Sequence, residues 1–136
     1  MPLKVIGAGP AGSAAAITAL REGCEVRLFE KSALPRHKVC GEFLTPEVAP
    51  LLKWLRCWDA FQQAGPAPVR RAKLHFGRRV KKWTLPEPGF GLSRYRLDRL
   101  LLDQALGLGA QLIRQPASAN GGSTVIAHGQ IGRAHV

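Results

Sequence analysis

Hydrophobic positions change their spacing several times along the chain, and each change predicts a new element. Apolar strand patterns cover residues 3–6 and 25–30. Between them, a run of small residues ends at Gly23, which is typical of a helix that lies close to a sheet. The order strand, glycine turn, helix and strand predicts a βαβ unit with parallel strands, and therefore an α/β fold.

The next apolar positions follow a helical spacing. Residues 45–47, a threonine, a proline and a glutamate, favour a helix start, and apolar residues continue at helical spacing to Leu55. Trp54 and Trp58 fall in this region. We expect both indoles in the core, and the lining of a substrate pocket is the alternative.

Residues 69–85 alternate between apolar and basic side chains. This pattern predicts two antiparallel strands joined by a turn at Gly77 and Arg78. We expect them to belong to a substrate-side sheet outside the βαβ unit. Residues 86–91 contain two prolines and two glycines, and they are expected to form a loop.

A further helix is predicted over residues 97–108, where leucines form one apolar stripe. Its acids, Asp98 and Asp103, are expected to be solvated or to pair locally with Arg99, so neither is a catalytic candidate. Two short apolar segments after this helix predict strands, at residues 110–113 and 124–127.

The first turn has the spacing G-x-G-x-x-G, which binds the pyrophosphate of an adenine dinucleotide. Gly7 permits a tight exit from the strand, Gly9 lets the backbone approach a phosphate, and Gly12 lets the helix pack closely. The helix start adds unpaired N–H groups and a positive partial charge. The alternative is an ordinary βαβ turn that is glycine-rich by chance. The cofactor-binding residues predicted in this turn are Gly7, Gly9, Pro10, Ala11, Gly12 and Ser13.

Glu30 ends the second strand about twenty residues after this turn, where an acid accepts the ribose hydroxyls. Its charge would repel a 2′-phosphate, so the site disfavours NADP. The long connection that follows, residues 31–45, is expected to pass back over the dinucleotide. Its candidate cofactor-binding residues are Lys31, Arg36, Lys38, Cys40 and Gly41.

Composition and charge limit the other functions that this chain could have. The formal net charge is +11, with much of it between residues 70 and 82, and such a patch can attract nucleic acid, anionic lipid or an acidic partner. We favour the solvated face of a strand pair, so no nucleic-acid partner is expected. No metal, disulfide or nucleophile pattern and no membrane span is visible, which indicates a cytoplasmic protein. No catalytic residue is assigned.

The last six residues, Ile131 to Val136, match what a common sequencing adapter encodes. We expect them to be a non-native tail. Residues 1–130 would then be an incomplete cofactor-binding domain, with the strand pair as an insertion at about residues 69–85.

Four segments together resemble a known family: GAGPAG at residues 7–12, Glu30, PRHKVCGEFLTP at 35–46 and SRYRLDRLLLDQA at 93–105. They are similar to the amino-terminal half of the FAD-dependent oxidoreductases that include para-hydroxybenzoate hydroxylase and the geranylgeranyl reductases. The resemblance implies that residues 38–41 lie beside the flavin of FAD and that Arg94 contacts the cofactor. It also implies a small-molecule substrate, isoprenoid or aromatic, and NAD(P)H as a possible reductant.

The fold expected on this basis is a Rossmann-like FAD-binding βαβ unit with part of an antiparallel substrate-side sheet, truncated. The expected function is the FAD-binding part of a monooxygenase or of a geranylgeranyl-reductase-like enzyme, with weak or no FAD retention by the 136-residue chain. Cys40 is expected to pack near the flavin, because Thr45 occupies the position of a second redox cysteine. The alternatives are a non-enzymatic NAD-binding module and a basic hairpin that binds nucleic acid or a membrane.

Overall fold

The computed structural model describes residues 1–34 and 42–127. These residues form two compact units. The first unit combines residues 1–34 with residues 95–127, and the second comprises residues 42–94. The predicted boundary at residue 130 lies outside the described residues.

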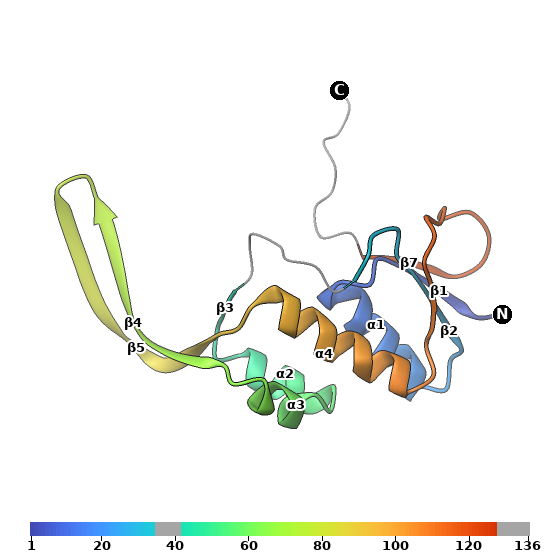
Figure 1. Ribbon diagram of the computed structural model, residues 1–136, viewed down its shortest axis with the longest axis horizontal. Coiled ribbons are helices and arrows are strands. Elements are labelled where there is room, and N and C mark those ends of the chain that lie inside the picture. The colour runs from blue at the N-terminus through green and yellow to red at the C-terminus, as the bar shows by residue number, and fades with distance from the viewer. Residues whose placement is uncertain (35–41, 128–136) are drawn as a thin grey trace. The chain divides into compact units, whose positions relative to one another are not determined.

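The first unit is built on a parallel sheet with the strand order β6-β2-β1-β7 (Figure 1). Val5 lies opposite both Leu28 and Val125, and Leu28 lies opposite Leu112, so apolar residues form a row across the sheet. The four strands predicted from the hydrophobic pattern are confirmed to within one residue at each end. They are β1 (Leu3–Ile6), β2 (Val26–Phe29), β6 (Gln111–Ile113) and β7 (Thr124–Ile126).

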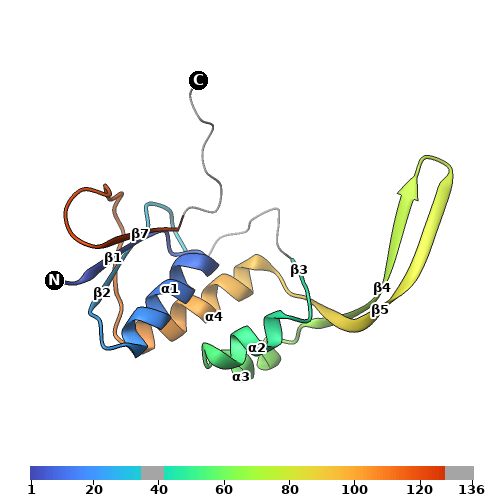
Figure 2. The same cartoon turned by 180° about the vertical axis from the view of Figure 1, so that it is seen from behind.

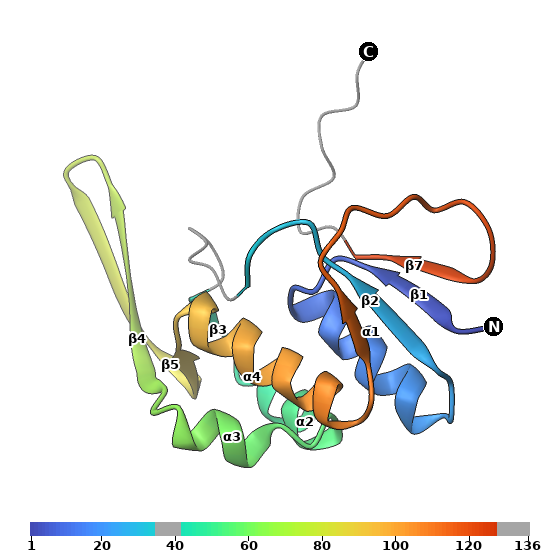
Figure 3. The same cartoon turned by 45° about the vertical axis from the view of Figure 1, so that its right-hand side comes forward.

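Two helices, α1 (Pro10–Arg21) and α4 (Arg94–Gly107), lie side by side on one side of this sheet (Figure 3). Helix α1 connects the parallel strands β1 and β2, as the βαβ pattern predicts. Ile17 of α1 is fully buried, as are Val5 and Leu28 of the sheet. The predicted slim helix therefore packs on the sheet through a few bulky residues among small ones.

The start of α1 lies so close to the end of β1 that Gly12 has no room for a side chain. A Cβ built on Gly12 would overlap the carbonyl oxygen of Gly7 and lie 2.8 Å from the carbonyl carbon. Gly7 has a φ of 103°, in the region that favours glycine. The steric roles predicted for Gly7 and Gly12 are confirmed.

Helix α4 buries one acid along with its apolar stripe. Asp98 is only 2% exposed, so the expectation that it is solvated is wrong. It precedes the buried residues Leu101 and Leu102 by three and four positions, which places all three on one face of the helix. The other acid, Asp103, forms the expected local ion pair with Arg99, with 3.7 Å between nitrogen and oxygen.

The second unit contains an antiparallel sheet with the strand order β3-β5-β4. Its strands are β3 (Phe43–Leu44), β4 (Ala67–Phe76) and β5 (Arg79–Gly91). Strands β4 and β5 form a hairpin whose turn is at Gly77 and Arg78, as predicted. Figure 2 shows that this hairpin extends well beyond the part of β5 that pairs with β3.

The prediction of a loop at residues 86–91 is wrong, because β5 continues to Gly91. The end of β5 is held by pairing on both sides: Phe90 lies opposite Leu44 of β3 and Pro68 of β4. Pairing with β4 is irregular only between the positions opposite Val69 and Arg71, where the prolines of β5 fall. Proline lacks an N–H, so it interrupts the ladder there without ending the strand.

Between β3 and β4 the chain forms two short helices, α2 (Val48–Trp54) and α3 (Trp58–Gln63). Helix α2 begins after the predicted start at residues 45–47, with Glu47 as its N-cap residue and no side-chain cap. A hydrogen bond from Thr45 lowers the pKa of the Glu47 carboxyl. Arg56 has a φ of 58°, in the left-handed region, and it separates the two helices.

The core of the second unit is made by Leu52, Leu55, Cys57, Phe61 and Leu92. Phe61 is fully buried, and its ring centroid lies 5.5 Å from that of Trp58 and 5.5 Å from that of Phe90. Trp58 is half-buried and packs on this core residue, in line with its expected position. Trp54 is 51% exposed, so the same expectation is wrong for this residue.

We expect Gly12→Ala to lower the free energy of unfolding by about 1–3 kcal/mol, because the new methyl group forces α1 away from β1. The measurement is urea denaturation followed by circular dichroism. The matched control is Gly107→Ala in α4, where an added Cβ meets nothing within 4 Å. The control should be neutral or more stable by up to about 1 kcal/mol. Equal stability of the two variants would contradict the close approach.

A second prediction concerns the thiols. Burial raises the pKa of the Cys57 thiol, so less thiolate is present at a given pH, whereas Cys24 is exposed. In a Cys40→Ser background, we expect Cys24 to react with an aromatic disulfide reagent at pH 8 at least about tenfold faster than Cys57. Cys24→Ser should remove the fast phase. Two equal fast phases in the folded protein would contradict the burial of Cys57.

Candidate dinucleotide-binding site

The candidate site lies at the edge of the parallel sheet where β1 ends and α1 begins. Backbone hydrogen bonds fix the turn from both neighbouring strands. The N–H of Gly7 donates to the carbonyl of Phe29 at 2.8 Å, and the N–H of Ala127 donates to the carbonyl of Ile6 at 2.8 Å. The turn is therefore held over the carboxyl ends of the strands, where α/β sheets bind ligands.

Glu30 connects the turn to the end of β2. One carboxylate oxygen accepts the N–H of Ala8 at 3.0 Å, and the other accepts the N–H of Ser32 at 2.9 Å. Glu30 also donates its own N–H to the carbonyl of Ile113, at the end of β6, at 3.0 Å. We call this arrangement of Glu30 with Ala8 and Ser32 the Glu30 clasp. In it, two backbone N–H groups orient the acid toward the turn.

The first turn of α1 presents its backbone without competing side chains. Gly9 is the N-cap residue and forms no side-chain cap, Pro10 occupies the first helical position, and no acid is present in the first turn. The N–H groups of Ala11 and Gly12 have no acceptor within the helix, because the first turn has no preceding carbonyls. Such a helix start favours an anion.

Ser13 has a different position from its neighbours in the turn. Its side chain is fully buried, and its hydroxyl donates to the carbonyl of Ala8 at 3.4 Å. Its N–H donates to the carbonyl of Gly9 at 2.9 Å. Ser13 thus supports the turn from behind, and its direct contact with a cofactor stays a prediction.

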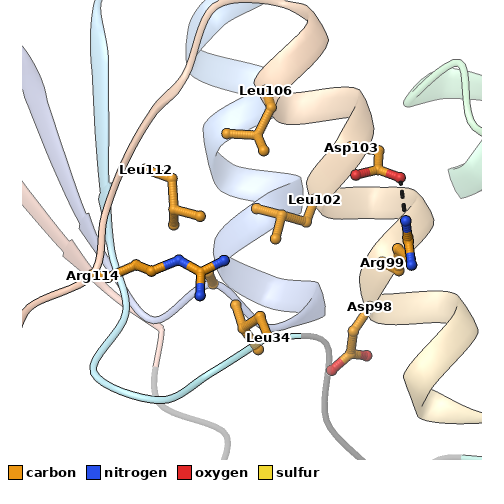
Figure 4. A pocket seen from close by; sticks show the side chains of 9 residues that line it. Leu34, Asp98, Arg99, Leu102, Asp103, Leu106, Leu112 and Arg114 are labelled. Carbon is orange, nitrogen blue, oxygen red and sulfur yellow. Dashed lines mark ion pairs between the residues drawn. The ribbon is translucent and has the colours of Figure 1, made fainter.

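A pocket of about 320 Å³ opens beside the turn, between α4 and the end of β6. Figure 4 shows the side chain of Arg114 reaching into this space, toward Leu34 and Leu102. We call it the α4–β6 pocket. It is lined by Ala8, Leu34, Asp98, Arg99, Leu102, Asp103, Leu106, Leu112 and Arg114.

Asp98 and Arg114 line this pocket, although neither was predicted from the sequence as a site residue. For Asp98 a signal was present, because it shares the helical spacing of the buried leucines of α4. For Arg114 the signal was its place directly after β6, since the end of a parallel strand lies at the ligand-binding edge.

The structure does not bring the remaining predicted site residues to the turn. Lys31 is exposed, next to Glu30 in the chain. Arg94 begins α4 and is half-buried, at the boundary of the second unit. The other four candidates in the long connection lie outside the described residues. They are Arg36, Lys38, Cys40 and Gly41.

Within residues 1–34 and 42–127, no group of three or more histidine, cysteine, aspartate or glutamate side chains is arranged to hold a metal ion. No helix in the same ranges is both long and apolar enough to span a bilayer.

The turn fits a dinucleotide in two respects. First, Gly9 and Gly12 leave the backbone of residues 9–12 open to a phosphate. Gly12 lies so close to Gly7 that an added methyl group would overlap the carbonyl of Gly7. Second, the Glu30 clasp fixes an acceptor of hydroxyl groups beside the helix start. A pyrophosphate needs the first feature, and the adjoining ribose needs the second.

Sequence comparison relates this chain to flavin enzymes. The profile of the family described as glucose inhibited division protein A matches residues 2–82, more than half of the 136 residues. Menaquinone reductase of Mycobacterium tuberculosis is 35% identical over 119 residues, which cover 80% of this chain and 28% of the reductase. The flavin-dependent halogenase armH3 of Armillaria mellea is 35% identical over 117 residues, which cover 81% of this chain and 23% of the halogenase.

Solved structures show the same fold. The 2-methyl-3-hydroxypyridine-5-carboxylic acid oxygenase superposes with a TM-score of 0.70 and 28% identity, over 82% of this chain and 30% of the oxygenase. The myxobacterial chondrochloren halogenase CndH superposes with a TM-score of 0.74 and 27% identity, over 84% of this chain and 28% of the halogenase.

The chain spans less than a third of the length of each of these four proteins. The superpositions cover 82% and 84% of this chain, whose described residues form a parallel sheet and an antiparallel sheet. The expected fold class is thereby confirmed. With its profile match over more than half of its residues, the chain belongs to the glucose inhibited division protein A family of FAD-binding flavoproteins.

Proposed function

We propose that this chain forms the FAD-binding, amino-terminal part of a flavin-dependent oxidoreductase. The observation that carries the proposal is the Glu30 clasp, in which both carboxylate oxygens accept backbone N–H groups at 2.9 and 3.0 Å. The clasp holds the acid at the sheet edge directly beside the turn. An acid in this position accepts the hydroxyls of a ribose.

The residues of the turn would hold the rest of the adenosine diphosphate part of FAD. The backbone N–H groups of Gly9, Ala11 and Gly12 would bind the pyrophosphate, with Pro10 setting the start of the helix. Glu30 would bind the ribose. Arg36 or Lys38 would offset phosphate charge, and Lys31 is a further binding candidate next to Glu30. By family likeness, residues 38–41, which include Cys40 and Gly41, would lie beside the flavin, and Arg94 would contact the cofactor.

When FAD is bound, its isoalloxazine ring supplies the redox chemistry, taking up and passing on hydride or electrons. The described residues would bind FAD and orient it. The turn would hold the cofactor through its phosphates, and Ser13, whose side chain is fully buried, supports the turn from behind. No described residue is assigned a proton transfer.

The proposed substrate of the whole protein is a small aromatic molecule. The names of similar proteins include a tryptophan 2-halogenase, an oxygenase of a hydroxypyridine carboxylic acid and a menaquinone reductase. The oxygenase and the halogenases support a monooxygenase-like reaction, whereas the menaquinone reductase supports the geranylgeranyl-reductase-like branch. An isoprenoid substrate, NAD(P)H as reductant and a cytoplasmic location remain parts of the proposal.

The alternative in the same site is a non-enzymatic module that binds NAD without flavin. Both ligands contain adenosine diphosphate, so the turn alone does not separate them. We favour FAD because the family and the similar structures are flavoproteins. The two readings differ in the relative affinity of the protein for FAD and NAD.

We expect the purified chain to bind FAD more tightly than NAD, and Glu30→Gln to weaken FAD binding by about tenfold or more, because a charge-assisted hydrogen bond is lost. Isothermal titration of both cofactors measures this. Glu25→Gln is the matched control, since Glu25 is exposed just before β2, and its affinity should stay within about twofold. Tighter NAD than FAD binding would favour the sensing module, and equal affinity of both variants would remove the role of Glu30.

A second candidate function is binding of a polyanion by the β4–β5 hairpin. Lys73 lies directly opposite Lys82, and Arg71 lies opposite Thr84, so one face of the hairpin collects positive charge. Most residues of both strands are exposed. This face could contact nucleic acid or an anionic membrane surface.

If the hairpin binds a polyanion, affinity for duplex DNA or for phosphatidylserine vesicles should fall steeply with salt. The double variant Lys73→Gln/Lys82→Gln should reduce the slope of log K against log salt for DNA by about 2. Glu30→Gln, in the other unit, should leave that slope unchanged. Absence of measurable binding at about 50 mM salt would exclude this candidate.

A further inference from the structure

The loop between β6 and β7 contains the only asparagine of the chain, Asn120, and Gly121 follows it directly. Both residues are exposed. Asparagine is among the thermally labile residues of proteins. Its side-chain amide can be attacked by the backbone nitrogen of the next residue. An exposed Asn-Gly pair is therefore a position where the chain can modify itself.

The surroundings of Gly121 leave its backbone nitrogen accessible. A Cβ built on Gly121 would meet nothing within 4 Å, so no neighbouring group crowds this residue. Gly121 and Gly122 both have a φ of 78°, in the region that favours glycine. Within the described residues, no hydrogen bond engages the N–H of Gly121. The nitrogen that would attack is thus neither shielded by a side chain nor held by an acceptor.

Lys4 of β1 places a positive charge on the peptide bond between Asn120 and Gly121. Its Nζ donates to the main-chain carbonyl of Asn120 at 2.9 Å, and its N–H donates to the carbonyl of Ser123 at 3.1 Å. The Asn120 carbonyl and the Gly121 N–H belong to one amide group. A cationic donor on the oxygen therefore stabilises the anion that forms when the nitrogen loses its proton.

The reaction balances with solvent alone. A base from solvent takes the proton of the Gly121 nitrogen, which then attacks Cγ of the Asn120 side chain. The N–Cγ bond forms, the Cγ–Nδ2 bond breaks, and Nδ2 takes up a proton from solvent and leaves as ammonia. The product is a succinimide ring. Water then opens either carbonyl of the ring and gives aspartate or isoaspartate at position 120.

We propose that Asn120 is a site of self-deamidation through a succinimide, and that Lys4 accelerates this reaction by binding the Asn120 carbonyl. The site precedes β7, so it lies toward the amino ends of the parallel strands. The candidate dinucleotide site lies at their carboxyl ends. The inference is therefore independent of the proposed function, and neither fails with the other.

The test compares folded wild type and Lys4→Gln during incubation at mildly alkaline pH, with peptide mapping by mass spectrometry. Lys4→Gln should deamidate about two- to fivefold more slowly, because an exposed charged contact has a small effect on a barrier. Lys4→Arg keeps a charged donor and should stay near the wild-type rate.

The matched control is Arg27→Gln. Arg27 is exposed on β2 directly opposite Lys4, so this variant removes a neighbouring positive charge and keeps the Lys4 contact. Its rate should stay within about 1.5-fold of the wild type. In urea the contact is lost, so unfolded wild type and unfolded Lys4→Gln should deamidate at the same rate. Circular dichroism confirms that each variant is folded without urea.

The outcomes separate the site from the role of Lys4. Two product peptides, one with aspartate and one with isoaspartate, support the succinimide, and aspartate alone would overturn it. A folded wild type that stays unmodified while the unfolded chain deamidates would overturn the site. Equal rates for folded wild type and Lys4→Gln, or equal slowing in Arg27→Gln, would overturn the role of Lys4.

Discussion

The candidate site depends on two pieces of backbone that lie closer together than any side chain would permit. The start of α1 is pressed against the end of β1 at Gly12 and Gly7, where an added methyl group would overlap a carbonyl oxygen. This contact brings the unpaired N–H groups of the helix start to the edge of the sheet. The Glu30 clasp then joins the same turn to β2. Helix, turn and two strands thus form one fixed frame.

Much of this frame could be predicted from the sequence because it is local. The glycine spacing, the small residues of α1 and the acid at the end of β2 all lie within residues 3–30. Strands β6 and β7 could be predicted as well, because each is a short apolar segment of the chain, at residues 110–113 and 124–127. The loop predicted at residues 86–91 shows the limit of this reasoning. Its prolines and glycines are poor strand formers, yet pairing with β3 and β4 holds them extended.

The α4–β6 pocket could not be predicted in this way because it combines residues that are far apart in the chain. Ala8 and Leu34 come from one end of the first unit, and Leu102 and Arg114 come from the other, with the second unit inserted between them. Asp98 illustrates the same point within one helix. Its charge suggested a solvated position, but its place on the apolar face decided its burial.

The prolines of β5 have a consequence for how copies of this protein meet. Along most of its length, β5 pairs with β4 on one side, and β3 covers the other side only at residues 90 and 91. The uncovered side of such a strand could add a strand from another molecule and begin aggregation. Lys81 and Lys82 bring repelling charges to this strand, and Pro86 and Pro88 interrupt its regular extended pairing. Charge and proline in β5 therefore disfavour growth of the hairpin into a larger intermolecular sheet.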